Sequence, residues 1–272
     1  MKLILFSKRL KEKTVPELAE LGAEFGIDGY DLAVRPEFPV SPDNVKETLP
    51  EACRVLRESG LDVPMVTGHF ELRWPDHPSV EPLLRAMDES DVRLLKLAYY
   101  QFDWKTDDYQ KKVDEVRAGF EGWQELSRKH GVKICYHTHS NRNMGLNAGS
   151  LAHLLSGFDP ACLGAYLDTC HLITEGEKFS TAVGMVRPYV SIISLKDALL
   201  ERVPTNGHGG VKRTLPEAGG GMVNWTGVFE CLEEIGFDGP LSVHCEFDIE
   251  GDVIPAIARE TAFFRKFIPK GE

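Results

Sequence analysis

Asp168 and His171 are three residues apart, directly after the apolar run 163–167. The run is too short for a helix and predicts a buried strand, which places the carboxylate at the carboxyl end of the strand and the imidazole in the following loop. An oxygen ligand and a nitrogen ligand at this spacing can bind one divalent cation. The commoner interpretation of so short a motif is an Asp that caps the next helix and a His that packs. The metal hypothesis therefore requires similar groups from other strands.

Three further apolar runs end in ionisable groups. These groups are His137 and His139, then Lys196, then His244 and Glu246. Because side chains alternate along a strand, the members of each i, i+2 pair point to the same side. Taken singly, each imidazole fits a satisfied polar group, and Lys196 fits a surface ion pair. Groups converging from four strands indicate a shared site, because ionisable side chains are rarely buried unless they are paired or bound to metal.

The elements that would position these groups alternate along the chain. Eight mostly continuous apolar runs are predicted strands, as expected when both faces of a sheet are covered: 2–6, 30–34, 63–67, 93–97, 132–136, 163–167, 190–195 and 240–244. Predicted helices lie between them, at 14–25, from 41 onward with a kink at Pro50, and at 79–90, 108–130, 149–156, 178–187, 225–235 and 251–267. Eight serial βα units predict an α/β fold, a (β/α)₈ TIM barrel in one domain over residues 1–272. The glycine-rich segment 198–223 is predicted to be a long functional loop.

Composition excludes several classes of protein. The formal net charge is −11, from 42 acidic and 31 basic residues, and no dense basic cluster is present, so nucleic acid is not an expected partner. No apolar stretch approaches 18 residues, which argues against a membrane span, and the first apolar run is too short for a signal peptide. The six cysteines show no disulfide framework. The expected location is the cytoplasm, and a homo-oligomer is compatible with the sequence.

Several segments carry a resemblance to a known family. They are GYDLAVRP at 29–36, HTHS at 137–140, DTCH at 168–171, LKD at 195–197, GGGMVNW at 219–225 and GPLSVHCE at 239–246. In these segments the chain resembles the xylose-isomerase-like TIM-barrel superfamily, in its sugar phosphate isomerase/epimerase branch. The DTCH segment is also similar to AP-endonuclease-type barrels. Strands 4 and 7 offer no His for the larger ligand cluster of those enzymes, so DNA repair is not expected.

The resemblance implies a divalent cation held by a Glu on strand 5, an Asp on strand 6, a His on strand 7 and a Glu on strand 8. Asp168 matches the Asp, whereas His137, Ser194 and His244 stand at the other three positions. Two alternatives follow: a site with substituted, imidazole-rich ligands, or no metal site. For the first alternative the expected ligands are Asp168, His171, His137 and Glu246. Imidazole ligands favour Mn²⁺, Zn²⁺, Co²⁺ or Fe²⁺ over Mg²⁺.

The resemblance also implies an enzyme that isomerises or epimerises a sugar, a sugar phosphate or a polyol through an enediolate. Glu246 is expected to be a ligand or the base, His137 or His139 the proton carrier, and Lys196 the group that stabilises negative charge on oxygen. The expected substrate-binding residues are His69, His139, Trp74, Trp104 and His244, with Phe70 in the apolar wall. Two alternatives stay open: a lyase similar to inosose dehydratase, and a non-catalytic sugar-binding barrel.

Overall fold

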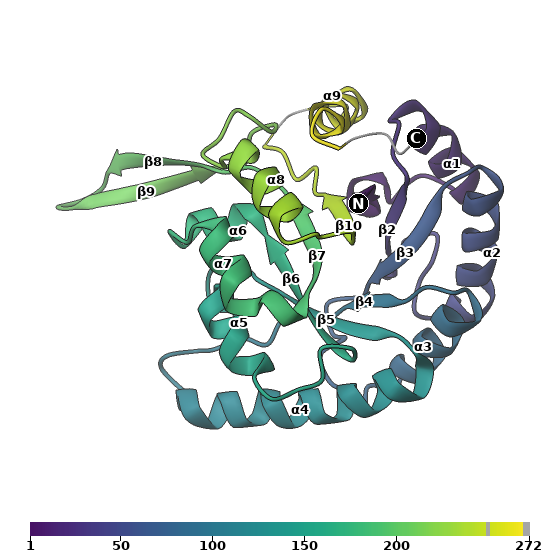
Figure 1. Cartoon of the computed structure of the whole chain (residues 1–272), viewed down its shortest axis with the longest axis horizontal. Helices are drawn as coiled ribbons and strands as arrows, with labels where there is room; N and C mark the ends of the chain where they lie inside the picture. Colours follow the sequence, from purple (N-terminus) through teal and green to yellow (C-terminus); the bar gives the residue numbers. More distant parts are fainter. Residues whose placement is uncertain (249–250, 269–272) are drawn as a thin grey trace.

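Eight parallel strands close into a barrel that is surrounded by helices (Figure 1). The structure is a computed structural model and describes residues 1–248 and 251–268. The barrel strands are β1 (Lys2–Phe6), β2 (Gly29–Ala33), β3 (Asp62–Thr67), β4 (Leu94–Lys96), β5 (Lys133–His137), β6 (Leu163–Asp168), β7 (Val190–Leu195) and β10 (Pro240–Val243). Each pairs with the barrel strands before and after it in the chain, and β10 pairs with β1. The predicted (β/α)₈ barrel is confirmed.

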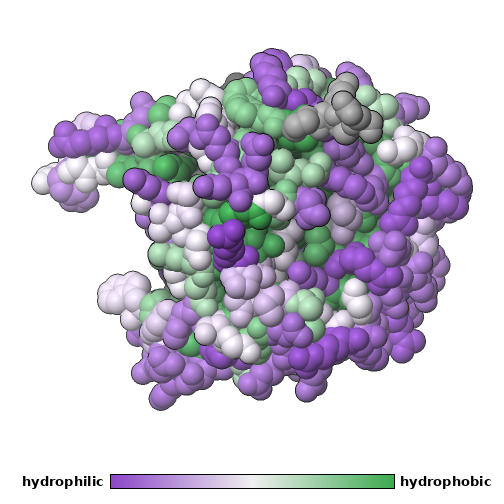
Figure 2. All heavy atoms as spheres, in the orientation of Figure 1, coloured by the Kyte–Doolittle hydropathy of each residue, from purple (hydrophilic) through white to green (hydrophobic). Residues whose placement is uncertain are grey.

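The connecting helices cover the outside of the barrel. They are α1 (Val15–Glu24), α2 (Val45–Glu58), α3 (Val80–Glu89), α4 (Tyr109–His130), α5 (Ala148–Leu155), α6 (Thr169–Thr174), α7 (Phe179–Val186), α8 (Trp225–Glu234) and α9 (Ile254–Arg265), with 3₁₀ turns η1 (Ser7–Leu10) and η2 (Arg187–Tyr189). Figure 2 shows mainly hydrophilic side chains over α2, α3 and α4, whose apolar faces are buried. Among the described residues, no helix combines the length and the apolar composition needed to cross a membrane.

The barrel interior changes character along the strands. A small apolar cluster fills one level, formed by Ile4, Met65, Cys135, Tyr166 and Ile192. Two residues further along β3, β5 and β7, the residues are polar: Thr67, His137 and Ser194. These polar side chains are buried as well, so each needs a partner. The apolar level closes the bottom of the barrel, and the carboxyl ends of the strands carry the polar chemistry, as in TIM-barrel enzymes.

The segment 198–223 is not the irregular loop that the sequence predicted. It contains an antiparallel hairpin of β8 (Leu199–Pro204) and β9 (Gly209–Thr214), which stands out from the barrel (Figure 1). The prediction was wrong because these short strands are largely exposed and carry no apolar pattern. The dipeptide Asn206-Gly207 was an available signal, since such dipeptides favour hairpin turns and Gly207 has a φ of +83°.

The helices also differ from the predictions in three places. His171 lies in the short helix α6 rather than in a loop. The second helix begins at Val45 instead of 41, and it continues through Pro50. The last helix begins at Ile254 instead of 251, and residues 249–250 just before the predicted start lie outside the described residues.

The glycine-rich part of segment 198–223 is held by one buried carboxylate. Asp197 accepts hydrogen bonds from the backbone N–H groups of Gly219, Gly221 and Val223 at 2.9–3.1 Å. It also accepts one from the indole Nε1 of Trp225 at 3.1 Å. Asp197 therefore fixes the return of the chain from the hairpin into α8.

Candidate functional site

A small pocket of about 100 Å³ lies at the carboxyl ends of the barrel strands. The residues that line it are Phe6, Lys8, Arg35, Thr67, Phe70, Lys96, Tyr99, His137, His139, His171, Lys196, His244 and Glu246. The structure thus brings together the imidazoles, the lysine and the glutamate that the sequence singled out near the carboxyl ends of β5, β7 and β10. His137 is the last residue of β5 and the others follow the strand ends, which parallel strands bring to one face of the barrel.

Asp168 lies beneath this pocket and is completely buried. Its Oδ1 accepts a hydrogen bond from the backbone N–H of His171 at 2.9 Å, which caps helix α6. Its Oδ2 accepts one from the hydroxyl of Ser194 at 2.9 Å and lies 3.6 Å from Nζ of Lys196. Burial alone would raise the pKa of Asp168, but Lys196 and the nearby histidines hold it well below its ordinary value. The carboxylate is therefore charged. One of its oxygens caps helix α6, and the other contacts Ser194 and Lys196.

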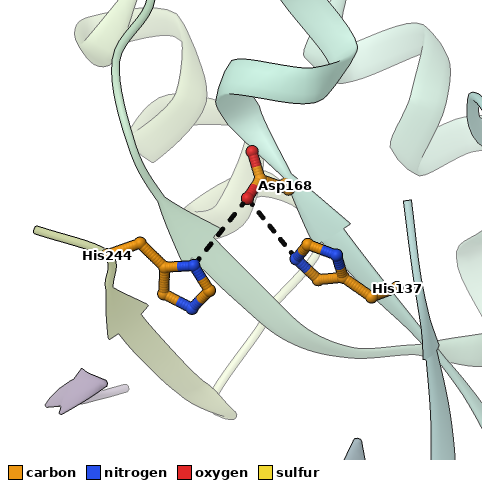
Figure 3. Close-up of side chains that lie close together, drawn as sticks. All are labelled: His137, Asp168 and His244. Atoms are coloured by element: carbon orange, nitrogen blue, oxygen red, sulfur yellow. Dashed lines mark ion pairs between the residues drawn. The ribbon is translucent and has the colours of Figure 1, made fainter. Parts of the chain in front are cut away.

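Two imidazoles face the same oxygen of Asp168 (Figure 3). Nε2 of His137 is 3.4 Å from Oδ2 of Asp168, and Nδ1 of His244 is 4.0 Å from it. The other ring nitrogen of each histidine contacts a tyrosine hydroxyl, 3.0 Å away in Tyr99 for His137 and 2.8 Å away in Tyr166 for His244. Each tyrosine therefore orients its histidine so that one nitrogen points toward Asp168.

These three residues fit a divalent cation. The ligand atoms of His137, Asp168 and His244 all lie within 4.8 Å of one another. Nε2 of His137 is buried and has no hydrogen-bond partner among the described residues, as expected of an atom that binds an ion. Burial lowers the pKa of His137 to about 3, so the ring is neutral and can donate its lone pair. Tyrosine hydroxyls on the far nitrogens resemble the supporting hydrogen bonds that orient metal-binding histidines.

A second group of close ligand atoms consists of Asp168, Cys170 and His171. Both ring nitrogens of His171 are already engaged, Nδ1 with the hydroxyl of Ser140 at 2.8 Å and Nε2 with Nζ of Lys196 at 3.2 Å. Burial also raises the pKa of the Cys170 thiol to about 12, which favours the neutral form. The group around His137 is therefore the better candidate for a metal, although the sequence had favoured His171 over His244 as a ligand.

Lys196, which is buried, and Glu246, which is partly exposed, form an ion pair at the pocket wall, with Nζ 2.9 Å from Oε2. Lys8 from η1 contacts the other oxygen of Glu246. Burial alone would raise the pKa of Glu246, but Lys196, His244 and Lys8 together hold it far below its ordinary value. Burial alone would lower the pKa of Lys196, but Asp168 and Glu246 raise it. Glu246 was expected to be a metal ligand, yet its two oxygens bind ammonium groups, and it is not part of either ligand group.

Three expected substrate-binding residues lie outside the pocket. Nε2 of His69 contacts the hydroxyl of Ser79 at 2.7 Å, and the ring faces a different surface hollow. Trp74 packs edge-on against Tyr100, with ring centroids 4.8 Å apart. The side chain of Trp104 is 74% exposed. These residues lie on the loops after β3 and β4, from which Phe70, which is 66% exposed, and Tyr99 do line the pocket.

Three pocket cations were not predicted: Lys8, Arg35 and Lys96. Arg35 stands two residues after β2, and Lys96 is the last residue of β4. The predicted strand 4 ran to residue 97, so Lys96 was counted within the strand rather than at its end. A charged residue inside an apolar run was the available signal, because a buried lysine requires an explanation.

A larger cavity of about 350 Å³ lies outside the barrel against α6, α7 and α8. Glu177 and Lys178 are the charged residues among those that line it, and it shares no lining residue with the pocket at the strand ends. The chemistry is therefore concentrated at the smaller pocket.

Comparisons with known proteins agree with this architecture. A family model described as xylose isomerase-like TIM barrel matches residues 19–267. The crystal structure of 3-keto-D-glucoside 4-epimerase from E. coli superposes with a TM-score of 0.77 at 15% identity, covering 98% of this chain and 99% of that one. The probable 3-DHS dehydratase of Bacillus anthracis superposes with a TM-score of 0.73 at 16% identity, covering 97% and 99%. At these identities the likeness is one of fold.

A curated relative matches part of the sequence. Inosose dehydratase of Lacticaseibacillus casei is 26% identical over 156 residues, which are 54% of this chain and 51% of that protein. The chain thus spans about half the length of the curated relative it matches.

Proposed function

This chain belongs to the xylose isomerase-like TIM-barrel family, and we propose that it is an enzyme that isomerises or epimerises a sugar or polyol by proton transfer beside a carbonyl. One observation carries the proposal. Neutral imidazoles, a charged carboxylate and an ammonium group converge from separate strands on one small pocket. Proton transfer next to a carbonyl requires these groups: a base, a proton carrier and a positive charge near the oxygen.

Each group has a role that follows from its state. Glu246 is ionised, and it becomes the base that takes the carbon-bound proton when substrate displaces Lys8 or Lys196 from one of its oxygens, which frees that oxygen and raises its basicity. Lys196 is protonated, and its ammonium stabilises the negative charge that then develops on the substrate oxygen. His139 is the proton carrier. Burial lowers its pKa, and its Nδ1 contacts Ser140 and Asn143, which leaves Nε2 to exchange a proton with substrate.

His137, Asp168 and His244 would hold the divalent cation. When bound, such an ion supplies Lewis-acid polarisation of a carbonyl oxygen. Two imidazoles and one carboxylate suit Zn²⁺, Fe²⁺, Co²⁺ or Mn²⁺ better than Mg²⁺. Tyr99 and Tyr166 then fix the ring orientation of the two histidines.

The test is hydrogen exchange in D₂O. We expect the purified protein, supplied with Mn²⁺ or Zn²⁺, to introduce deuterium next to the carbonyl of at least one member of a panel of ketoses and inososes, read by mass spectrometry. Exchange by Glu246→Gln should be slower by about 100-fold or more, because a general base contributes at least that factor. Glu217→Gln is the control, since Glu217 pairs with Arg259 on the surface. No deuterium in any sugar, or equal exchange by Glu246→Gln, would contradict the proposal.

Dehydration is a second candidate, favoured by the likeness to an inosose dehydratase. It begins with the same proton removal, after which a neighbouring carbon loses hydroxide that His139 protonates. The same samples distinguish the two reactions, because dehydration lowers the product mass by one water, whereas isomerisation changes it only by the deuterium taken up.

A further inference from the structure

Two buried cations in the pocket lack an acidic partner. Arg35 and Lys96 are each only 6% exposed. Within the described residues, neither side chain forms an ion pair or donates a hydrogen bond, and Nε of Arg35 is a buried donor without an acceptor. An unpaired charge in the interior is costly, so its presence points to a partner that the protein chain does not supply.

The neighbouring acids are already engaged. Lys8 and Lys196 both bind Glu246. Asp31, which lies near Arg35, accepts hydrogen bonds from Thr67 at 2.7 Å and Ser242 at 2.9 Å. These hydroxyl groups leave the charge of Asp31 in place, but Asp31 forms no ion pair with Arg35 or Lys96. Four cations line the pocket against one acid, Glu246, and among the described residues Arg35 and Lys96 are the two that no carboxylate contacts.

Aromatic faces hold both cations in place. The guanidinium carbon of Arg35 lies 4.4 Å from the ring centroid of Phe70 and 5.3 Å from that of Phe6. Nζ of Lys96 lies 4.1 Å from the ring centroid of Tyr99. A ring face orients a cation without neutralising it, so the N–H groups stay available to a ligand. Burial and the nearby Arg35 lower the pKa of Lys96 to about 7, against the opposing effect of Asp31 and Glu246, as expected for a buried ammonium that no carboxylate contacts directly.

The cations also lie close to the reacting groups. The ring face of Tyr99 contacts Nζ of Lys96, and its hydroxyl shares a hydrogen bond with Nδ1 of His137. A ligand held by Lys96 is thus one side chain away from the candidate metal site. A planar guanidinium beside an ammonium is suited to an oxyanion, because the guanidinium can bind two oxygens at once.

We propose that Arg35 and Lys96 bind an oxyanion of the substrate, a carboxylate or a phosphate, so that the enzyme acts on an acidic sugar or polyol rather than a neutral one. This inference rests on the proposed function, since it names the substrate class of the same pocket.

The test compares three six-carbon polyols that differ in charge: D-glucitol, D-gluconate and D-glucitol 6-phosphate. None is a ketose, so binding is measured by calorimetry on the metal-supplied protein without turnover. We expect at least one acidic polyol to bind about tenfold or more tightly than D-glucitol, the effect of one charge-assisted hydrogen bond. Preference for gluconate identifies a carboxylate, and preference for the phosphate identifies a phosphate ester.

Variants establish which residues cause the preference. Arg35→Gln and Lys96→Met should each remove most of it, whereas Lys105→Met removes a cation beside the exposed Trp104 and should leave it unchanged. Lys96→Met should also raise the melting temperature of the ligand-free protein, because it removes an unpaired buried charge. This second measurement shows that loss of binding is not loss of folding.

Three results would overturn the inference: equal affinity for all three polyols, no binding of any, or a preference that survives in both pocket variants. Deuterium exchange into a neutral ketose without any preference for acidic polyols would refute the anion site alone and leave the proposed function standing. If the protein neither introduces deuterium into any sugar nor binds any of the three polyols, both the anion site and the proposed function are refuted.

Discussion

Asp168 has two roles that appeared to be alternatives in the sequence. It caps helix α6 through Oδ1 and gathers His137, Ser194 and Lys196 around Oδ2. A helix cap uses one carboxylate oxygen and leaves the other free, so capping and ligand binding are compatible. The short motif was ambiguous because its spacing satisfies both roles.

Removing the charge of Asp168 should destabilise the protein. We expect Asp168→Asn to lower the free energy of unfolding by about 3 kcal/mol at pH 7, because Lys196 loses one of two buried counter-charges. In the double variant with Lys196→Met the loss should be smaller than the sum of the two single losses, as urea unfolding will measure. Additive losses would show that the pair is not coupled.

The pH dependence of that difference has a definite sign. The pKa of Asp168 in the folded protein lies well below its ordinary value near 3.8. Its stabilisation is therefore fully present above about pH 4 and is lost as the pH falls further toward the folded-state pKa. The difference in the free energy of unfolding between wild type and Asp168→Asn should stay constant from pH 8 to pH 5 and become smaller below pH 5. A gap that widens in acid would contradict the assigned charge.

Tyr99 should affect metal affinity without touching the ion. We expect Tyr99→Phe to weaken Zn²⁺ binding by about 10- to 100-fold, because His137 loses the hydrogen bond that orients its ring. Competition with a chelating dye measures this affinity. Tyr109→Phe, at an exposed tyrosine on α4, is the matched control. Equal affinities for the two variants would mean that Tyr99 does not support a ligand.

At the scale of elements, the glycine-rich segment after the hairpin is a fixed turn. A Cβ on Gly221 would lie 2.2 Å from Oδ1 of Asp197, so no larger residue fits without breaking the hydrogen bonds of that carboxylate. The sequence had predicted only a long functional loop there. Glycine here permits close approach to a carboxylate, which composition alone does not reveal.

Two glycine substitutions should therefore have opposite effects. Gly221→Ala should lower the free energy of unfolding by about 2 kcal/mol through overpacking against Asp197. Gly184→Ala, in α7 with nothing within 4 Å of its Cβ, should raise it by about 0.5–1 kcal/mol through helix propensity. Chemical denaturation measures both. A neutral Gly221→Ala would show that the turn can relax.

Helix α9 carries a buried acid, Glu260, which should make stability decrease with rising pH. Burial raises its pKa to about 8 in the folded protein, against an ordinary value near 4.5. Between these values the folded state binds more protons than the unfolded state, so this group destabilises the protein progressively as the pH rises from 4.5 to 8. We expect Glu260→Gln to remove a slope of at most about 1.4 kcal/mol per pH unit. Parallel pH profiles for the variant and the wild type would contradict the raised pKa.

For the whole molecule, the repeated βα pattern was sufficient to predict the barrel. The strand ends followed, because parallel strands bring their carboxyl ends to one face. His137, His139, Lys196, His244 and Glu246 could therefore be grouped from the sequence. Their contacts could not be predicted, since the partner of each depends on side chains from distant strands.

The residues that were missed share a physical cause. Arg35 lies in one of the segments that carry the resemblance and Lys96 in a predicted strand, but neither was assigned a role, because the absence of an ion pair at either one is visible only in three dimensions. Trp74 and Trp104 were expected to bind substrate but lie outside the pocket. Packing sets the direction of a long loop, as the contact of Trp74 with Tyr100 shows. The hairpin was missed because exposed strands lack an apolar pattern.

The most direct test of the metal-assisted site is anomalous X-ray diffraction from crystals grown with Mn²⁺ or Zn²⁺. We expect one ion, at about 2.0–2.2 Å from Nε2 of His137, a carboxylate oxygen of Asp168 and Nδ1 of His244. No anomalous peak among these three atoms, or a peak between Cys170 and His171 instead, would contradict it.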